Sequence, residues 1–303
     1  MNRIALYFAS GESLYLGAAL LVLVVVLPIF LQRTWMLRIR NVGAWIALIF
    51  MVMACPPFAL AVDLIFAAVF VLWFITSNQA SPSQTSMRLQ RVSAVFLTAL
   101  VLVLTAIEFS QRRMPRISGS TSDHLVVIGD SISSGINPRV QAWPLVLQQR
   151  CGVDVRNLAR PGAQVSEGLI IARGLTNNDH LLLIEIGGND LLMGVSSDEY
   201  GKSLDALLSR VTAPNRTVVM FELPLLPNKI AYGQIQRRLS AKYRVSLIPK
   251  RYFAQVIGDA NATTDGLHLS ASGAQRMTSV VAQALSPLLP SCQSHSNVAA
   301  DRP

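Results

Sequence analysis

Charged residues are scarce in this 303-residue sequence. They make up 14% of the chain, whereas hydrophobic residues make up 51%. Residues 1–116 contain three acids and long uncharged apolar runs, and residues 117–303 have the mixed composition of a water-soluble domain. A single soluble domain is thereby excluded, because such domains typically carry about 25% charged residues. The sequence predicts a membrane-embedded region of residues 1–116 followed by a second domain.

Two further absences exclude classes of function. Most of the net charge of +9 lies beside the apolar runs, and no basic cluster in the second half could serve as a nucleic-acid footprint. The sequence has no HExxH or comparable metal-ligand spacing, and its first strand-to-helix turn lacks the GxGxxG pattern of dinucleotide sites. We therefore expect no nucleic-acid partner, no metal and no organic cofactor.

Cysteine is also rare, with three in the chain. Cys55 lies within an apolar run and is expected to be a buried thiol. Cys151 and Cys292 lie in the second half, where they would pair in an oxidising compartment. Two free thiols fit the sequence equally well, so the pairing stays open.

Apolar stretches in the first region predict about four membrane-spanning helices, at residues 13–31, 42–55, 58–76 and 92–109. Pro56 and Pro57 divide the second stretch from the third and predict a tight hairpin. Because residues 42–55 are few for a full span, a re-entrant segment and a three-span arrangement stay open. A cleavable signal peptide is disfavoured, since Glu12 interrupts its n-region and no small-x-small site follows.

The arginines between the spans predict the orientation of the chain. Five of them lie in the two loops that four spans would place on one side, and four lie on the other side. The positive-inside rule then gives a small preference for a second domain outside the cytoplasm. We expect a bacterial inner-membrane protein whose second domain faces the periplasm. Asp63 is the one acid well inside a predicted span. A headgroup-level position near the hairpin is favoured over an intramembrane function.

The second domain is predicted to occupy residues 124–290, between a linker at 117–123 and a flexible tail at 291–303. Strands are expected at residues 124–129, 153–157, 180–186, 216–222 and 245–248, and helices near 143–150, 164–174, 198–212, 229–243 and 272–286. Continuous apolar strands that alternate with helices indicate a parallel sheet covered on both faces. Ligands of such sheets bind at the carboxyl ends of the strands.

Four segments at or beyond the predicted strand ends carry reactive groups, namely GDSIS (129–133), ARPGAQ (159–164), IGGND (186–190) and DGLHLS (265–270). They supply a hydroxyl, a glycine turn, a side-chain amide, and a carboxylate with an imidazole. Acyl transfer requires these groups: a nucleophile, a base, a residue that orients the base, and donors for the developing oxyanion. Each segment alone also fits an ordinary turn.

In order and spacing, these segments resemble the SGNH (GDSL-type) hydrolase family over roughly residues 124–286, and most closely its esterase and lysophospholipase branch. The matched blocks are GDSI at 129–132, the glycine at 162, GGND at 187–190 and DGLH at 265–268. Ile132 stands where the family name has leucine. The resemblance implies a flavodoxin-like three-layer αβα domain with a five-stranded parallel sheet.

The resemblance also implies the roles of individual residues. Ser131, His268 and Asp265 are expected to form the catalytic triad. The backbone N–H groups of Ser131 and Gly162 and the side-chain amide of Asn189 are expected to form the oxyanion hole.

The scarcity of histidine supports this assignment, since the chain has four. His124 and His180 begin predicted strands and should lie at the edge opposite the site, and His295 lies in the tail. His268 is the histidine placed to serve Ser131. The nearby acids Asp130 and Asp190 are expected to fix their loops by accepting local N–H groups.

We therefore predict a membrane-anchored serine esterase that cleaves carboxylic esters or thioesters through an acyl-enzyme. Its expected partners are the bilayer and an ester substrate, either lipid-like or an acetylated envelope glycan. Acyl transfer to a sugar or lipid alcohol by the same triad is an open alternative, as is a non-catalytic membrane sensor with a hydrolase fold. The oligomeric state stays open.

Overall fold

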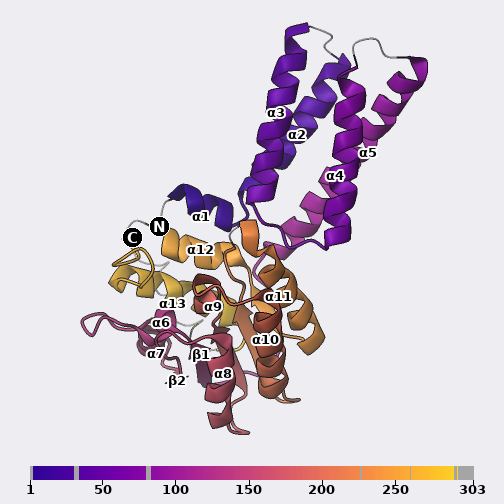
Figure 1. Cartoon of the computed structure of the whole chain (residues 1–303). Coiled ribbons are helices and arrows are strands. Elements are labelled where there is room, and N and C mark those ends of the chain that lie inside the picture. Colours follow the sequence, from indigo (N-terminus) through magenta and orange to yellow (C-terminus); the bar gives the residue numbers. More distant parts are fainter. Residues whose placement is uncertain are drawn as a thin grey trace. The chain divides into compact units, whose positions relative to one another are not determined.

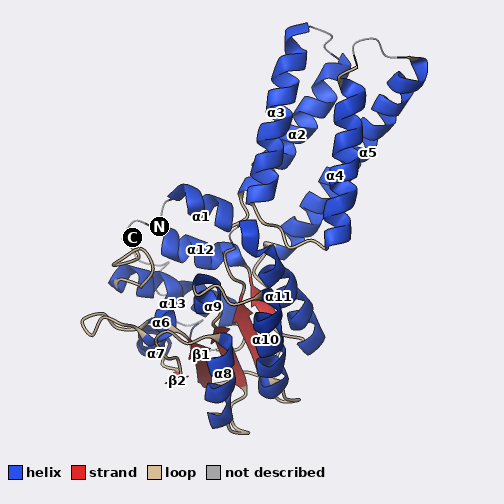
Figure 2. Cartoon of the chain, in the orientation of Figure 1, coloured by secondary structure: helices blue, strands red, loops and turns tan. Residues whose placement is uncertain are grey.

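The computed structural model describes residues 3–30, 34–79, 83–225, 227–259, 261–289 and 292. The chain divides into two compact units. One comprises residues 1–10, 114–225 and 231–303, and the other comprises residues 11–113 and 226–230. Figures 1 and 2 show the helices of the second unit and the mixed helices and strands of the first.

A five-stranded parallel sheet forms the centre of the first unit (Figure 2). Its strands are β1 (His124–Gly129), β2 (Asp154–Asn157), β3 (Leu181–Glu185), β4 (Thr217–Phe221) and β5 (Ser246–Ile248). They lie in the order β2-β1-β3-β4-β5. β1, β3 and β4 are almost entirely buried, which explains their continuous apolar sequences. The predicted α/β fold with five parallel strands is confirmed.

Helices cover both faces of this sheet. They are α6 (Ser131–Ser134), α7 (Trp143–Cys151), α8 (Val165–Ile171), α9 (Gly188–Leu192), α10 (Ser197–Val211), α11 (Ile230–Tyr243), α12 (Lys250–Gly258) and α13 (Ala271–Leu285), with short 3₁₀ turns η1 (Ala172–Gly174) and η2 (Pro227–Lys229). On one face, side chains of α7, α12 and α13 form a core with alternate residues of the strands. On the other face, Gly168 of α8 packs against Ile128 and Ile186, and against Leu207 of α10.

The first helix of the chain belongs to the sheet-containing unit. Helix α1 (Arg3–Ala9) packs on α12, and its Leu6 is buried in the same core as α12 and α13. Gly258 provides the space, because a Cβ there would lie 2.8 Å from Leu6 Cδ1. The chain thus leaves this unit after residue 10 and returns to it at residue 114.

A disulfide closes the same unit and answers the open question about the cysteines. Cys151, at the end of α7, is bonded to Cys292. The bond joins positions 141 residues apart in sequence. Cys55 is a buried free thiol, as expected. Apart from Cys292, the predicted tail at residues 291–303 lies outside the described residues.

The other unit consists of the helices α2 (Ser13–Phe30), α3 (Thr34–Met53), α4 (Leu60–Ser77) and α5 (Gln84–Gln111). α4 and α5 are long and apolar enough to cross a membrane, and a shorter apolar helix covers Ser13–Leu27. Gly17 allows α2 and α3 to approach closely, since a Cβ there would lie 2.8 Å from the Ala47 carbonyl oxygen. Small residues have this role in membrane helix pairs.

These four helices coincide in part with the predicted spans. α3 begins at Thr34 rather than residue 42, and α5 begins at Gln84 rather than residue 92. The additional segments, residues 34–41 and 84–91, contain polar residues. Such residues end an apolar run without ending a helix. Ser83 caps α5 by accepting a hydrogen bond from the Ser86 N–H. Hydropathy therefore located the apolar parts of these helices but not their true starts.

Candidate active site

The turn after β1 holds the expected nucleophile. β1 ends at Gly129, and α6 begins at Ser131, which is 8% exposed. Asp130 caps α6, because its Oδ1 accepts a hydrogen bond from the Ile132 N–H at 2.9 Å. The Ser131 hydroxyl thus lies at the carboxyl end of a central strand, on a turn fixed by its neighbouring carboxylate.

Gly129 is required by the tightness of this turn. A Cβ at position 129 would lie 2.7 Å from both Cβ and Oγ of Ser133 and 3.0 Å from the Glu185 carbonyl oxygen. Any side chain here would displace α6 or β3, and with α6 the Ser131 hydroxyl.

Asp265 and His268 form a hydrogen-bonded pair in the loop before α13. The Asp265 Oδ2 lies 2.5 Å from His268 Nδ1, while its Oδ1 accepts hydrogen bonds from the N–H groups of Leu267 and His268. These contacts hold the pKa of Asp265 well below its usual value, with the His268 side chain as the largest cause. An antiparallel bridge between Thr263 and Leu269 closes the loop. An ionised carboxylate on Nδ1 leaves Nε2 as the nitrogen that can accept a proton.

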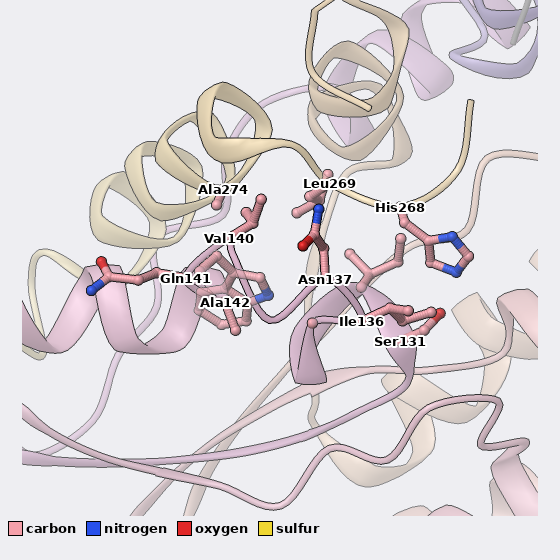
Figure 3. A pocket seen from close by; sticks show the side chains of 12 residues that line it. Ser131, Ile136, Asn137, Val140, Gln141, Ala142, His268, Leu269 and Ala274 are labelled. Carbon is pink, nitrogen blue, oxygen red and sulfur yellow. The ribbon is translucent and has the colours of Figure 1, made fainter. Parts of the chain in front are cut away.

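Ser131 and His268 line one pocket (Figure 3), together with residues of the loop before α7 and of the loop before α13. In Figure 3, the imidazole of His268 lies beside Ser131. Burial raises the pKa of Asp130, the residue next to Ser131, and the nearby His268 offsets part of that rise. Within the described part of the chain, no hydrogen bond joins the side chains of Ser131 and His268. Such bonds are often long in unliganded enzymes and shorten when substrate binds.

Three donors lie at this edge of the sheet. The Ser131 N–H belongs to the first residue of α6 and has no acceptor in its own helix. Gly162 has φ of +76°, which favours glycine, and its turn is tied to the nucleophile strand because the Arg160 N–H donates to the Gly129 carbonyl at 3.0 Å. The third donor is the amide of Asn189, in α9.

The Asn189 amide is engaged in this unliganded state. Its Nδ2 lies 3.2 Å from Asp130 Oδ2 and 3.0 Å from the Ala163 carbonyl oxygen. Because an amide has two N–H donors, both are occupied. Donation to a reaction intermediate would therefore require that one of these bonds be replaced or shared.

Two buried carboxyl groups lie close to Ser131. Burial raises the pKa of Asp130 to about 6, with the Ile132 N–H and His268 acting in the opposite direction. Glu185, the last residue of β3, is 2% exposed, and burial together with the nearby Asp130 raises its pKa well above the usual value. Within this pair, burial favours the protonated form of both carboxyl groups, and of Glu185 most strongly.

Sequence reasoning missed the network around Glu185. Its Oε2 accepts a hydrogen bond from Ser133 Oγ at 2.7 Å, and Ser133 Oγ accepts one from Trp143 Nε1 at 3.1 Å. The Asn157 amide donates to the Ser133 carbonyl at 2.9 Å. The network thus connects the ends of β2 and β3 to α6 and α7. A glutamate near the end of the apolar stretch HLLLIEI was the available signal.

Asp190, His124 and His180 were expected to lie around or away from the site without a catalytic role. Asp190 fixes its loop, since its Oδ2 accepts a hydrogen bond from the Val165 N–H at 3.0 Å. His124 lies at the opposite edge between Asp154 and Asp179, with ring nitrogen to carboxylate distances of 2.7 and 3.3 Å. His180 bonds the Asn215 carbonyl. His295 lies outside the described residues.

Comparisons with known proteins identify similar chains. Residues 127–276 match the model of the GDSL-like Lipase/Acylhydrolase family. The chain is 28% identical to Esterase TesA of Pseudomonas aeruginosa over 180 residues, which cover 54% of this chain and 89% of the relative. It is 25% identical to Thioesterase 1/protease 1/lysophospholipase L1 of Escherichia coli, over 56% of this chain and 86% of the relative.

A solved structure shares the fold. The psychrotrophic esterase EstA from Pseudoalteromonas sp., inhibited by monoethylphosphonate, superposes with a TM-score of 0.50 at 18% identity. The match covers 56% of this chain and 100% of that one.

Proposed function

The chain belongs to the GDSL-like lipase/acylhydrolase family and is a serine esterase of that type, and from this premise we propose that Ser131, His268 and Asp265 are its catalytic triad. The observation that carries the proposal is the pocket shared by Ser131 and His268, with Nδ1 of the imidazole held by Asp265. An oriented base beside a serine hydroxyl is the arrangement that activates it.

In the proposed reaction, Ser131 Oγ attacks the ester carbonyl while His268 Nε2 accepts its proton. Asp265 stabilises the imidazolium that forms. The N–H groups of Ser131 and Gly162 and the Asn189 amide bind the negatively charged oxygen of the tetrahedral intermediate. His268 then returns the proton to the leaving alcohol or thiol, and water releases the acid from Ser131 by the same route.

Hydrolysis of p-nitrophenyl acetate by the purified full chain tests the triad. Ser131→Ala and His268→Ala should each nearly abolish turnover, because the nucleophile or its base is gone. Ser134→Ala is the matched control, since Ser134 lies in the same short helix but does not line the pocket. Full turnover by the Ser131→Ala protein would refute the assignment.

We propose further that residues 11–113 anchor the enzyme in a membrane with four crossings. Two of the four helices are long and apolar enough to span. α1 and the catalytic domain belong to one compact unit, so the chain enters the membrane after α1 and leaves it before the catalytic domain on the same side. This requires an even number of crossings. This argument favours four over three.

The disulfide supports a periplasmic position of the catalytic domain. Stable disulfides are typical of oxidising compartments such as the periplasm, and Cys151 is bonded to Cys292. The arginine distribution favours the same orientation. Protease added to intact spheroplasts should therefore degrade the catalytic domain, and protection until the membrane is lysed would contradict the proposed orientation.

For the substrate, we propose acyl esters of lipids or acetylated envelope glycans, since an enzyme anchored in a membrane meets both. Rates on short-chain and long-chain acyl esters distinguish them. A preference for long chains supports the lipid substrate, and a preference for acetyl esters supports the glycan.

A further inference from the structure

A large apolar groove lies within the four-helix unit and has no role in the proposed reaction. Its volume is about 450 Å³, and most of the residues that line it come from α3 and α4. Trp45, Leu48 and Met51 come from α3, and Phe66 and Phe70 come from α4. A volume of this size is within the range of about 300–1,000 Å³ typical of small-ligand sites.

The groove lies between two helices that make few contacts with each other. α3 packs on α2, α4 packs on α5, and α2 and α5 pack together. Across the groove, Trp45 contacts Phe70 and Phe74 with ring centroids 5.9 and 5.6 Å apart. These rings join α3 and α4 at one level, and Pro56 and Phe58 of the hairpin also line the groove.

The surroundings of the groove favour a lipid acyl chain as its occupant. The outer faces of both walls carry exposed apolar side chains, among them Ile46 and Ile49 on α3 and Leu64 and Ile65 on α4. In the proposed membrane setting, acyl chains are the molecules that reach these faces. Van der Waals packing is a main source of stability between membrane helices, so a chain that fills the groove replaces contacts that α3 and α4 do not make.

One end of the groove is marked by a carboxylate. Asp63, in the first turn of α4, lines the groove, and no hydrogen bond or ion pair joins its side chain to another described residue. Val71 lines the same wall eight residues later, so the groove extends roughly 12 Å along α4. No basic side chain lines the groove within the described residues. An unpaired carboxylate in a medium of low polarity requires a cation or a donor.

We propose that this groove binds a membrane lipid with a primary ammonium headgroup, with the acyl chain between α3 and α4 and the ammonium on Asp63. Asp63 lies in the first turn of α4, close to the hairpin, which the proposed four crossings place at the membrane surface beside the lipid headgroups. The proposal rests on the proposed membrane insertion and is independent of the triad. The bound lipid would fill the space between α3 and α4.

Photolabelling of the full chain in nanodiscs tests the proposal. The probe is phosphatidylethanolamine with a diazirine on one acyl chain, and the comparison probe is the matching phosphatidylglycerol. Labelled peptides are mapped by mass spectrometry. We expect α3 and α4 peptides that carry groove residues to be labelled at least fivefold more by the ethanolamine probe than by the glycerol probe.

Two variants and one control make the test specific. Ala67→Trp fills the groove and should reduce groove labelling at least fivefold, and Asp63→Asn should remove the preference between the probes. Ala68→Trp is the matched control, because Ala68 is the adjacent exposed alanine and does not line the groove. Hydrolysis of p-nitrophenyl acetate, measured in parallel, should be unchanged in all three and shows that the protein is folded.

The outcomes separate the proposals. Equal labelling in the Ala67→Trp and Ala68→Trp proteins, or equal labelling by both probes, would overturn the lipid site. A groove occupied by a second copy of the chain would give chain–chain crosslinks without lipid label, and that result would overturn it as well. Failure of the chain to enter nanodiscs would instead refute membrane insertion, and absence of esterase activity would refute the triad alone.

Discussion

Asp130→Asn separates two effects of the carboxylate beside the nucleophile. Asp130 Oδ1 caps α6 and its Oδ2 accepts a hydrogen bond from Asn189. Asparagine keeps the cap, since its amide oxygen can accept the Ile132 N–H equally well. Its amide N–H group, however, would face that of Asn189, so that two donors meet where a donor and an acceptor met before.

The effect on stability follows from the pKa of this group. Burial raises the pKa of Asp130 from 3.8 to about 6 in the folded state. Because the folded-state pKa is the higher one, the wild-type protein loses stability as the pH rises from about 4, and the loss is complete above about 6. Between pH 4 and pH 8 this amounts to about 2 kcal/mol. The asparagine variant has no such group and avoids this loss.

The effect on activity is opposite in sign. With the Asn189 amide displaced, the proposed oxyanion hole loses the alignment of one donor. We expect kcat to fall roughly 10- to 100-fold, less than the 10²–10³ that removal of a donor costs. The variant should therefore gain stability relative to wild type as the pH rises, while it hydrolyses esters more slowly.

Thermal unfolding in detergent at pH 4 and pH 8, together with kcat on p-nitrophenyl acetate, measures both effects. The melting temperature of the variant minus that of wild type should rise by roughly 4–8 °C between the two pH values. Asp205→Asn is the control, since Asp205 is an exposed carboxylate paired with Lys242, and its kcat should not change. A difference in melting temperature that is flat with pH would refute the role assigned to Asp130.

Three further predictions concern the same domain. Asn189→Ala should lower kcat by roughly 10²–10³ with little change in KM, as measured on p-nitrophenyl acetate, because one oxyanion donor is lost; an unchanged kcat would remove Asn189 from the oxyanion hole. Gly129→Ala places a Cβ 2.7 Å from Ser133 Cβ and should destabilise the protein by about 1–3 kcal/mol in denaturant titrations while reducing activity; wild-type stability and activity would show that the turn is not tight. Cys151→Ser should lower stability by about 2–4 kcal/mol, and reductant should have the same effect on wild type but none on the variant.

The catalytic domain could be predicted from the sequence in most respects. β1, β3 and β4 are buried on both faces, so their apolar runs were unambiguous, and their observed ends lie within one residue of the expected ones. β2 and β5 were found although they are shorter. α12 was missed, although Phe253, Val256 and Ile257 have the spacing of a helix that buries one face.

Other features depend on contacts that no local pattern contains. The position of α1 is set by Leu6, which enters a core whose other buried residues begin at Ile117. The two hydrogen bonds of the Asn189 amide depend on the relative placement of the loops after β1, β2 and β3. The disulfide required the end of α7 to meet residue 292. In each case the sequence supplied the groups, and the tertiary fold decided which of them meet.

The central claim is that the Ser131 hydroxyl is activated by His268, and labelling with a fluorophosphonate probe tests it most directly. The purified full chain should be labelled once, at Ser131, as mapped by mass spectrometry of the modified peptide. His268→Ala should slow this labelling by orders of magnitude, because the proton of the hydroxyl has no acceptor. Labelling at another residue, or labelling of the His268→Ala protein at the wild-type rate, would contradict the account.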